Sequence, residues 1–114
     1  MIDFETHKTE QGTLVIRATG KLDSETNQYF FDCVKDEIEA GNKKIVINLY
    51  GLGYISSVGL GSLARASSRS AKAGGEIYLA RIESQVLEVL RMVRFDKIFH
   101  IYDTEHEAIE AIEA

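Results

Sequence analysis

The chain has 114 residues and a formal net charge of -5, with 45% hydrophobic and 27% charged residues. This length suits one core, so we expect a single domain over residues 1–114. The acidic balance, without any dense run of Lys or Arg, excludes the phosphate backbone of nucleic acid as a direct partner. No stretch approaches the roughly 18 consecutive apolar residues of a membrane span, and no basic and apolar leader opens the chain. We therefore expect a cytoplasmic protein.

The first half of the chain predicts two paired strands, a helix and a buried strand. Residues 2–6 and 13–18 have strand-like apolar patterns, and the short turn between them predicts antiparallel pairing. Helical spacing predicts a helix after residue 23, with an inner stripe of Phe30, Phe31, Val34 and Ile38. Residues 44–49 are nearly all aliphatic, which is typical of a central strand buried on both faces.

The second half predicts alternating helices and strands. A helix that ends at Gly74-Gly75 is expected to bury Leu60, Leu63, Ala64, Ser67 and Ala71. A strand over residues 77–80 precedes a helix with inward Val86, Val89, Leu90 and Val93. After a short strand near residues 98–101, Thr104 and Glu107 form the pattern of a capping box at the last helix. This alternation implies parallel pairing, so the predicted fold class is α/β with a mixed sheet.

The junction between the central strand and the next helix is the most informative stretch. We expect a glycine-rich turn at residues 51–53 and a helix start at Ser56 and Ser57. Serine is a favoured N-cap because its oxygen accepts a hydrogen bond from an unpaired first-turn amide. The same amides and the helix dipole also favour an anion, so a phosphate on such a serine fits without unfolding the helix. A cap and a surface switch both remain open here.

No catalytic constellation accompanies these serines. A nucleophile elbow needs glycine where Ile55 stands, a P-loop needs a lysine that residues 59–62 lack, and a dinucleotide fingerprint needs glycine in place of Ser56. The three histidines have no metal-ligand spacing, and Cys33, the only cysteine, is expected at the edge of the core. We therefore predict no enzymatic activity, no catalytic residue, no metal site and no cofactor.

Other charged and aromatic residues are assigned structural roles. We interpret the acidic residues of the last helix as a solvated face with favourable charge in its first turn: Glu105, Glu107, Glu110 and Glu113. Tyr50 and Tyr54 flank the predicted glycine turn. Two roles stay open for them, as anchors beneath the helix N-terminus or as exposed contacts for a partner.

Two blocks of sequence resemble one known family. The stretch Ile55-Ser56-Ser57-Val58-Gly59-Leu60-Gly61 resembles the signature loop of the STAS domain family, the bacterial anti-sigma factor antagonists. The stretch Gly20-Lys21-Leu22-Asp23 resembles the family's second landmark, at the end of an early strand. With the order of elements, the similarity spans essentially the whole chain. It implies a single-domain STAS-like layer with helices packed mainly on one face of the sheet.

The resemblance also implies a mechanism. Antagonists of this family bind an anti-sigma factor that is also a serine kinase, phosphorylation of a loop serine breaks the complex, and a PP2C-type phosphatase restores it. Aligned on the glycines of the loop, that serine is Ser57, while Ser56 replaces the family's aspartate and so removes one negative charge. Asp23 matches the aspartate beside the loop. The implied partner-binding residues are Asp23, Ser56, Ser57, Val58, Gly59, Leu60 and Gly61.

Two alternatives belong to other classes of protein. A STAS-type scaffold subunit of a signalling complex or lipid-transport assembly would use Ser57 merely as a cap. A small enzyme or ligand-binding module is disfavoured because no catalytic constellation is present. Asp23 likewise has two open roles, since it can cap the helix that follows it or form part of the partner surface beside Ser57.

Overall fold

Five strands form one sheet in the order of the sequence. The computed structural model describes residues 1–114, and the strands are β1 (Ile2–Lys8), β2 (Leu14–Leu22), β3 (Lys44–Ile55), β4 (Glu76–Ala80) and β5 (His100–Tyr102). The hairpin partners β1 and β2 are antiparallel, whereas β2, β3, β4 and β5 pair in parallel. The predicted mixed sheet and its antiparallel first pair are confirmed.

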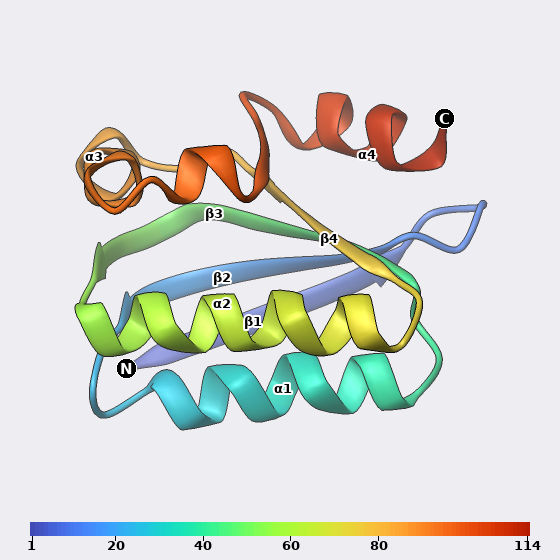
Figure 1. Cartoon of the computed structure of the whole chain (residues 1–114). Coiled ribbons are helices and arrows are strands. Elements are labelled where there is room, and N and C mark those ends of the chain that lie inside the picture. Colours follow the sequence, from blue (N-terminus) through green and yellow to red (C-terminus); the bar gives the residue numbers. More distant parts are fainter.

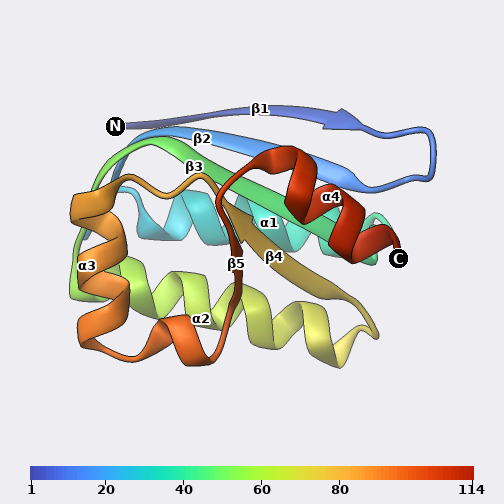
Figure 2. The same ribbon diagram turned by 90° about the horizontal axis from the view of Figure 1, so that it is seen from above.

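The helices lie mainly on one side of this sheet. Helices α1 (Asn27–Glu39) and α2 (Ser57–Lys72) run side by side beneath it, and α4 (Glu105–Glu113) lies on the opposite face (Figures 1 and 2). Helix α3 (Ser84–Met92) and the short 3-10 helix η1 (Phe95–Lys97) lie at the end of the sheet where α2 begins. One large apolar core joins the sheet to α1, α2 and α3, and a small second cluster lies under α4. The predicted α/β layer is confirmed.

Strand β3 is longer than the sequence predicts. The prediction of a glycine-rich turn at residues 51–53 is wrong, because β3 continues through them to Ile55 and stays paired with β2. A side chain at Gly51 would collide with Thr19 and with the carbonyl of Ala18 on β2. The glycine therefore permits close approach of two strands at a place where their register shifts, and the chain does not turn there.

Helix α2 is rotated about its own axis relative to the prediction, so that its buried face is shifted by about one residue along the sequence. Leu60 and Leu63 are buried as predicted, but Ala64, Ser67 and Ala71 are not, and the buried face instead contains Gly59, Leu60, Ser62, Leu63, Ala66 and Ser70. A side chain at Gly59 would collide with the carbonyl oxygen of Leu22, so this turn of helix lies directly against the end of β2. That contact fixes the face α2 presents to the core. In α3, Val86 and Leu90 are buried as predicted, whereas Val93 follows the helix and is exposed.

Candidate functional site

The start of α2 assigns different roles to two adjacent serines. Ser56 has an extended backbone, and its side-chain oxygen accepts a hydrogen bond from the backbone nitrogen of Gly59 at 3.2 Å. Ser56 is therefore the N-cap of α2. Ser57 takes the first helical position and is exposed to solvent. Because the cap comes from its neighbour, the helix does not need the Ser57 hydroxyl for capping.

The remaining residues of the loop divide into exposed and buried ones. Val58 is 48% exposed and Gly61 is exposed, whereas Gly59 and Leu60 are buried. Gly59 lies against the carbonyl of Leu22, where any side chain would collide. Gly59 and Leu60 therefore shape and position the junction, and a direct contact of either residue with a partner stays a prediction.

Asp23 caps the loop between β2 and α1. Its Oδ1 atom accepts hydrogen bonds from the backbone nitrogens of Glu25 (3.0 Å) and Thr26 (3.1 Å) and from the Thr26 hydroxyl (3.2 Å). Desolvation works to raise the pKa of the Asp23 carboxyl, but these hydrogen bonds outweigh it and hold the pKa below its usual value. All three bonds use one oxygen, so the capping role leaves Oδ2 for a further contact.

The fold brings the two sequence blocks together. Leu22 pairs with Ile55 in neighbouring parallel strands, and the backbone nitrogen of Ser56 donates to the carbonyl of Leu22 at 2.9 Å. The carboxyl ends of β2 and β3 therefore meet at one edge of the sheet, where α2 begins and the loop to α1 leaves (Figure 1). Asp23 and Ser57 each lie one residue beyond this contact. The exposed junction thus combines a free hydroxyl, a carboxylate and the apolar side chain of Val58.

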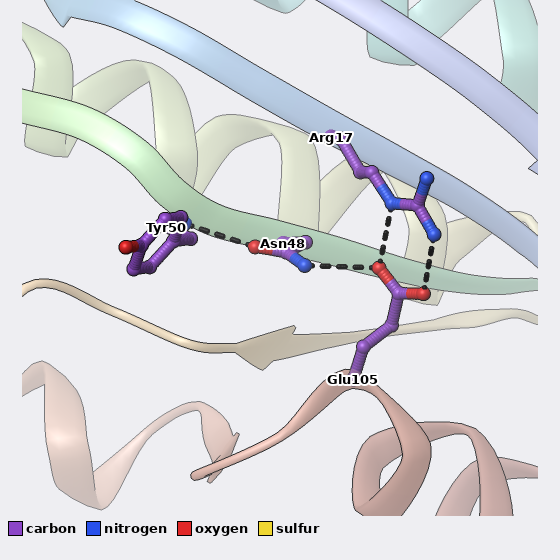
Figure 3. Close-up of polar contacts among 4 residues, drawn as sticks. All are labelled: Arg17, Asn48, Tyr50 and Glu105. Atoms are coloured by element: carbon purple, nitrogen blue, oxygen red, sulfur yellow. Dashed lines mark hydrogen bonds and ion pairs between the residues drawn. The ribbon is translucent and has the colours of Figure 1, made fainter.

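A second polar cluster, on the α4 face of the sheet, was not predicted. Arg17 Nε and Nη2 donate to the two carboxylate oxygens of Glu105 at 2.9 and 2.8 Å, and Asn48 Nδ2 donates to Oε1 at 2.9 Å (Figure 3). The hydrogen bonds from Arg17, and then that from Asn48, lower the pKa of Glu105 to about 2. At the other end of α4, Glu113 accepts hydrogen bonds from Thr9 and Thr13, both at 2.6 Å.

This cluster corrects two sequence interpretations. The acidic residues of α4 are not all a solvated face, because Glu105 and Glu113 fasten the two ends of the helix to the sheet. The one available signal was Asn48, a polar residue within an otherwise aliphatic strand. Tyr50 and Tyr54 are 55% and 51% exposed, so their interpretation as anchors beneath α2 is wrong.

The fold and the junction define a class of protein: a small α/β domain with a capped and partly exposed helix start at the carboxyl edge of its sheet. The chain belongs to the STAS domain family, whose model matches residues 5–108. No helix of the protein has the length and apolar character that crossing a bilayer requires.

Three relatives illustrate the similarity. An anti-sigma F factor antagonist of Paenibacillus polymyxa is 29% identical over 117 residues, covering 98% of this chain and 94% of the relative. The crystal structure of a proposed anti-sigma factor antagonist of Thermotoga maritima (tm1081) has a TM-score of 0.90 and 27% identity, covering 97% and 95% of the two chains. Phosphorylated SpoIIAA of Bacillus, a cell fate determinant, shares the fold, with a TM-score of 0.73, 20% identity and coverage of 96% and 99%.

Proposed function

We propose that this domain is an anti-sigma factor antagonist whose binding is switched by phosphorylation of Ser57. Without phosphate it binds an anti-sigma factor that is also a serine kinase, and phosphorylation by that kinase releases it. A PP2C-type phosphatase restores the binding form, and the cycle takes place in the cytoplasm. The names of the relatives support the general role. The observation that carries the switch is that Ser56 caps α2, which leaves Ser57 exposed and free of that duty.

The local chemistry favours a change in binding without a change in fold. A phosphate on Ser57 would lie at the positive end of α2, where unpaired amides and the helix dipole stabilise negative charge. The fold tolerates the modification for this reason. A partner packed on Val58 and Gly61 would meet a dianion in place of a hydroxyl, and the cost of desolvating or repelling that charge falls on the complex.

Asp23 contributes charge to the same surface. Its carboxylate follows the strand end that contacts Ser56, and only one of its oxygens is used in capping the loop. We propose that the other oxygen faces the partner or the hydroxyl that accepts the phosphate. Because serine replaces the family's aspartate at position 56, Asp23 supplies the carboxylate of this surface. In the non-switching scaffold alternative Ser57 serves merely as a cap, and the capping bond of Ser56 argues against that role of Ser57.

Mass spectrometry with the serine kinase of the same organism tests the proposal. Wild-type protein, Ser57→Ala and Ser56→Ala are each incubated with the kinase and ATP, and intact mass is measured. We expect one added phosphate on wild type and on Ser56→Ala, and none on Ser57→Ala. Equal phosphorylation of all three proteins contradicts the assignment, and loss in Ser56→Ala alone moves the site by one residue.

A further inference from the structure

A shallow hollow on the α4 face holds a second candidate contact. It has a volume of about 340 Å³ and lies beside the N-terminus of α4, and its charged and polar lining includes Glu5, Arg17, Asn48, Tyr50, Arg81 and Glu105. Two of its lining residues, Arg17 and Asn48, are paired across β2 and β3, and Asn48 is paired in turn with Ala80, which directly precedes Arg81. Figure 3 shows four residues of this lining: Arg17, Asn48, Tyr50 and Glu105.

The two arginines of the hollow differ in their free charge. Arg17 is held by both oxygens of Glu105, which also accepts from Asn48, so its charge is compensated within the chain. The guanidinium of Arg81 instead lies 4.0 Å from the centre of the Tyr50 ring. None of the ion pairs of the protein includes Arg81. Arg81 is thus a flat, pre-oriented cation without a carboxylate partner.

The backbone conformation of Arg81 indicates that its side chain has a function. Arg81 has φ of 53°, a left-handed conformation that glycine and asparagine adopt more readily than arginine. Its backbone nitrogen donates to the carbonyl of Tyr102 on β5 at 3.1 Å, which fixes the residue where the chain leaves β4 for α3. Strained residues held in this way cluster at functional sites. The chain keeps an arginine where a smaller residue would fit the backbone better.

The lining identifies what the hollow can receive. Tyr50 and Ala18 are its only apolar or aromatic surfaces, too little for a free small molecule to be held largely by apolar burial. A single carboxylate from a protein that makes its other contacts elsewhere fits better, since Arg81 offers donors in a fixed plane. Tyr54, which is also exposed, lies on β3 between Tyr50 and Ser56, so the same strand leads from the hollow to the Ser57 junction. Tyrosine and arginine are also the residues enriched where proteins bind one another.

We propose that Arg81, supported by Tyr50, receives an acidic side chain of the anti-sigma factor and forms a second arm of that interface. This inference rests on the proposed function, because it assumes that partner. The contact lies apart from the Ser57 hydroxyl, so it strengthens binding without taking part in phosphate transfer. Loss of the cation is therefore expected to raise the KM for this protein as a kinase substrate while kcat stays the same.

Titration calorimetry with the serine-kinase anti-sigma factor provides the test. Arg81→Gly and Arg81→Asn both suit a left-handed backbone and remove the cation, so we expect an unchanged or higher melting temperature and at least a tenfold rise in Kd. Arg81→Lys retains the charge without the flat guanidinium and should fall between them and wild type. The matched control is Arg69→Ala, since Arg69 on α2 pairs with Glu39 outside the hollow; its Kd should equal that of wild type.

The outcomes separate the two proposals. If wild type binds the anti-sigma factor and Arg81→Gly binds it equally well, the Arg81 contact is wrong while the Ser57 switch stands. If Arg69→Ala weakens binding as much as Arg81→Gly, general loss of positive charge explains the effect and the specific contact is overturned. If wild type itself does not bind, the proposed function and this inference fail together.

Discussion

The side-chain oxygen of Ser56 lies 3.2 Å from the backbone nitrogen of Gly59 and accepts its hydrogen bond. This contact separates two tasks that adjacent serines could have shared. Ser56 stabilises the first turn of α2, and Ser57 offers its hydroxyl to solvent. The helix can therefore keep its cap while its first residue changes charge.

Substitution of each serine by alanine should affect stability differently. Ser56→Ala removes the N-cap and is expected to lower the free energy of unfolding by about 0.5–2 kcal/mol. Ser57→Ala removes an exposed hydroxyl that does not cap the helix and should change it by less than about 0.5 kcal/mol. Urea unfolding followed by circular dichroism measures both values. A larger loss in Ser57→Ala would make Ser57 the residue on which the helix depends.

A negative charge at position 57 should disrupt binding and spare the fold. We expect Ser57→Asp to weaken the complex with the anti-sigma factor by more than about 1.4 kcal/mol, a tenfold rise in Kd. Aspartate is favourable in the first turn of a helix, so the melting temperature should stay near that of wild type. Calorimetry and circular dichroism decide the matter, and an unfolded variant would show that the residue is structural. Ser57→Asn is the matched control for side-chain size without charge.

Two substitutions of Asp23 separate capping from recognition. Asp23→Ala removes the oxygen that accepts from Glu25 and Thr26 and should lower stability by about 0.5–2 kcal/mol. Asp23→Asn keeps such an oxygen, so its melting temperature should be close to that of wild type. If the carboxylate belongs to the site, the Asn variant will still change partner affinity or the rate of Ser57 phosphorylation, and we expect this result. An Asn variant identical to wild type in both assays would remove Asp23 from the site.

Local patterns predicted most elements, and long-range contacts explain the errors. The run over residues 44–49 identified a central strand because four of its six residues are large aliphatic ones, a signal that is local in the sequence. The extension of β3 through Gly51 depends on the close approach of β2. From the sequence alone, a glycine at this position indicates a turn. Likewise, the orientation of α2 depends on the fit of Gly59 against Leu22, on another strand.

The sequence predicted the candidate site only in part. The Ser56-Ser57 pair and Asp23 could be found from two short motifs, but which serine caps the helix depends on a backbone angle that residue type does not fix. The Glu105 cluster could not be found, since its partners are 88 and 57 residues away along the chain. A glutamate at the start of a helix is more simply explained by the helix dipole. The importance of Arg81 could not be predicted from the sequence, because its strained left-handed backbone conformation exists only in the folded chain.

The Glu105 cluster should make stability depend on acid pH. In the folded protein the pKa of Glu105 is about 2, below the ordinary 4.5, so the contact contributes fully above about pH 4.5 and is lost as the pH falls towards 2. One pKa unit corresponds to about 1.4 kcal/mol. Because Arg17 is half-exposed and solvent screens the pair, we expect a contribution of only about 1–2 kcal/mol.

The free energies of unfolding in urea of wild type and Glu105→Gln should therefore differ by this amount at about pH 7 and converge at about pH 2. Glu88→Gln, at an exposed position of α3 and outside the ion pairs of the protein, is the control and should follow wild type throughout; a constant difference between wild type and Glu105→Gln at every pH would show that packing, and not the carboxylate charge, holds α4 to the sheet.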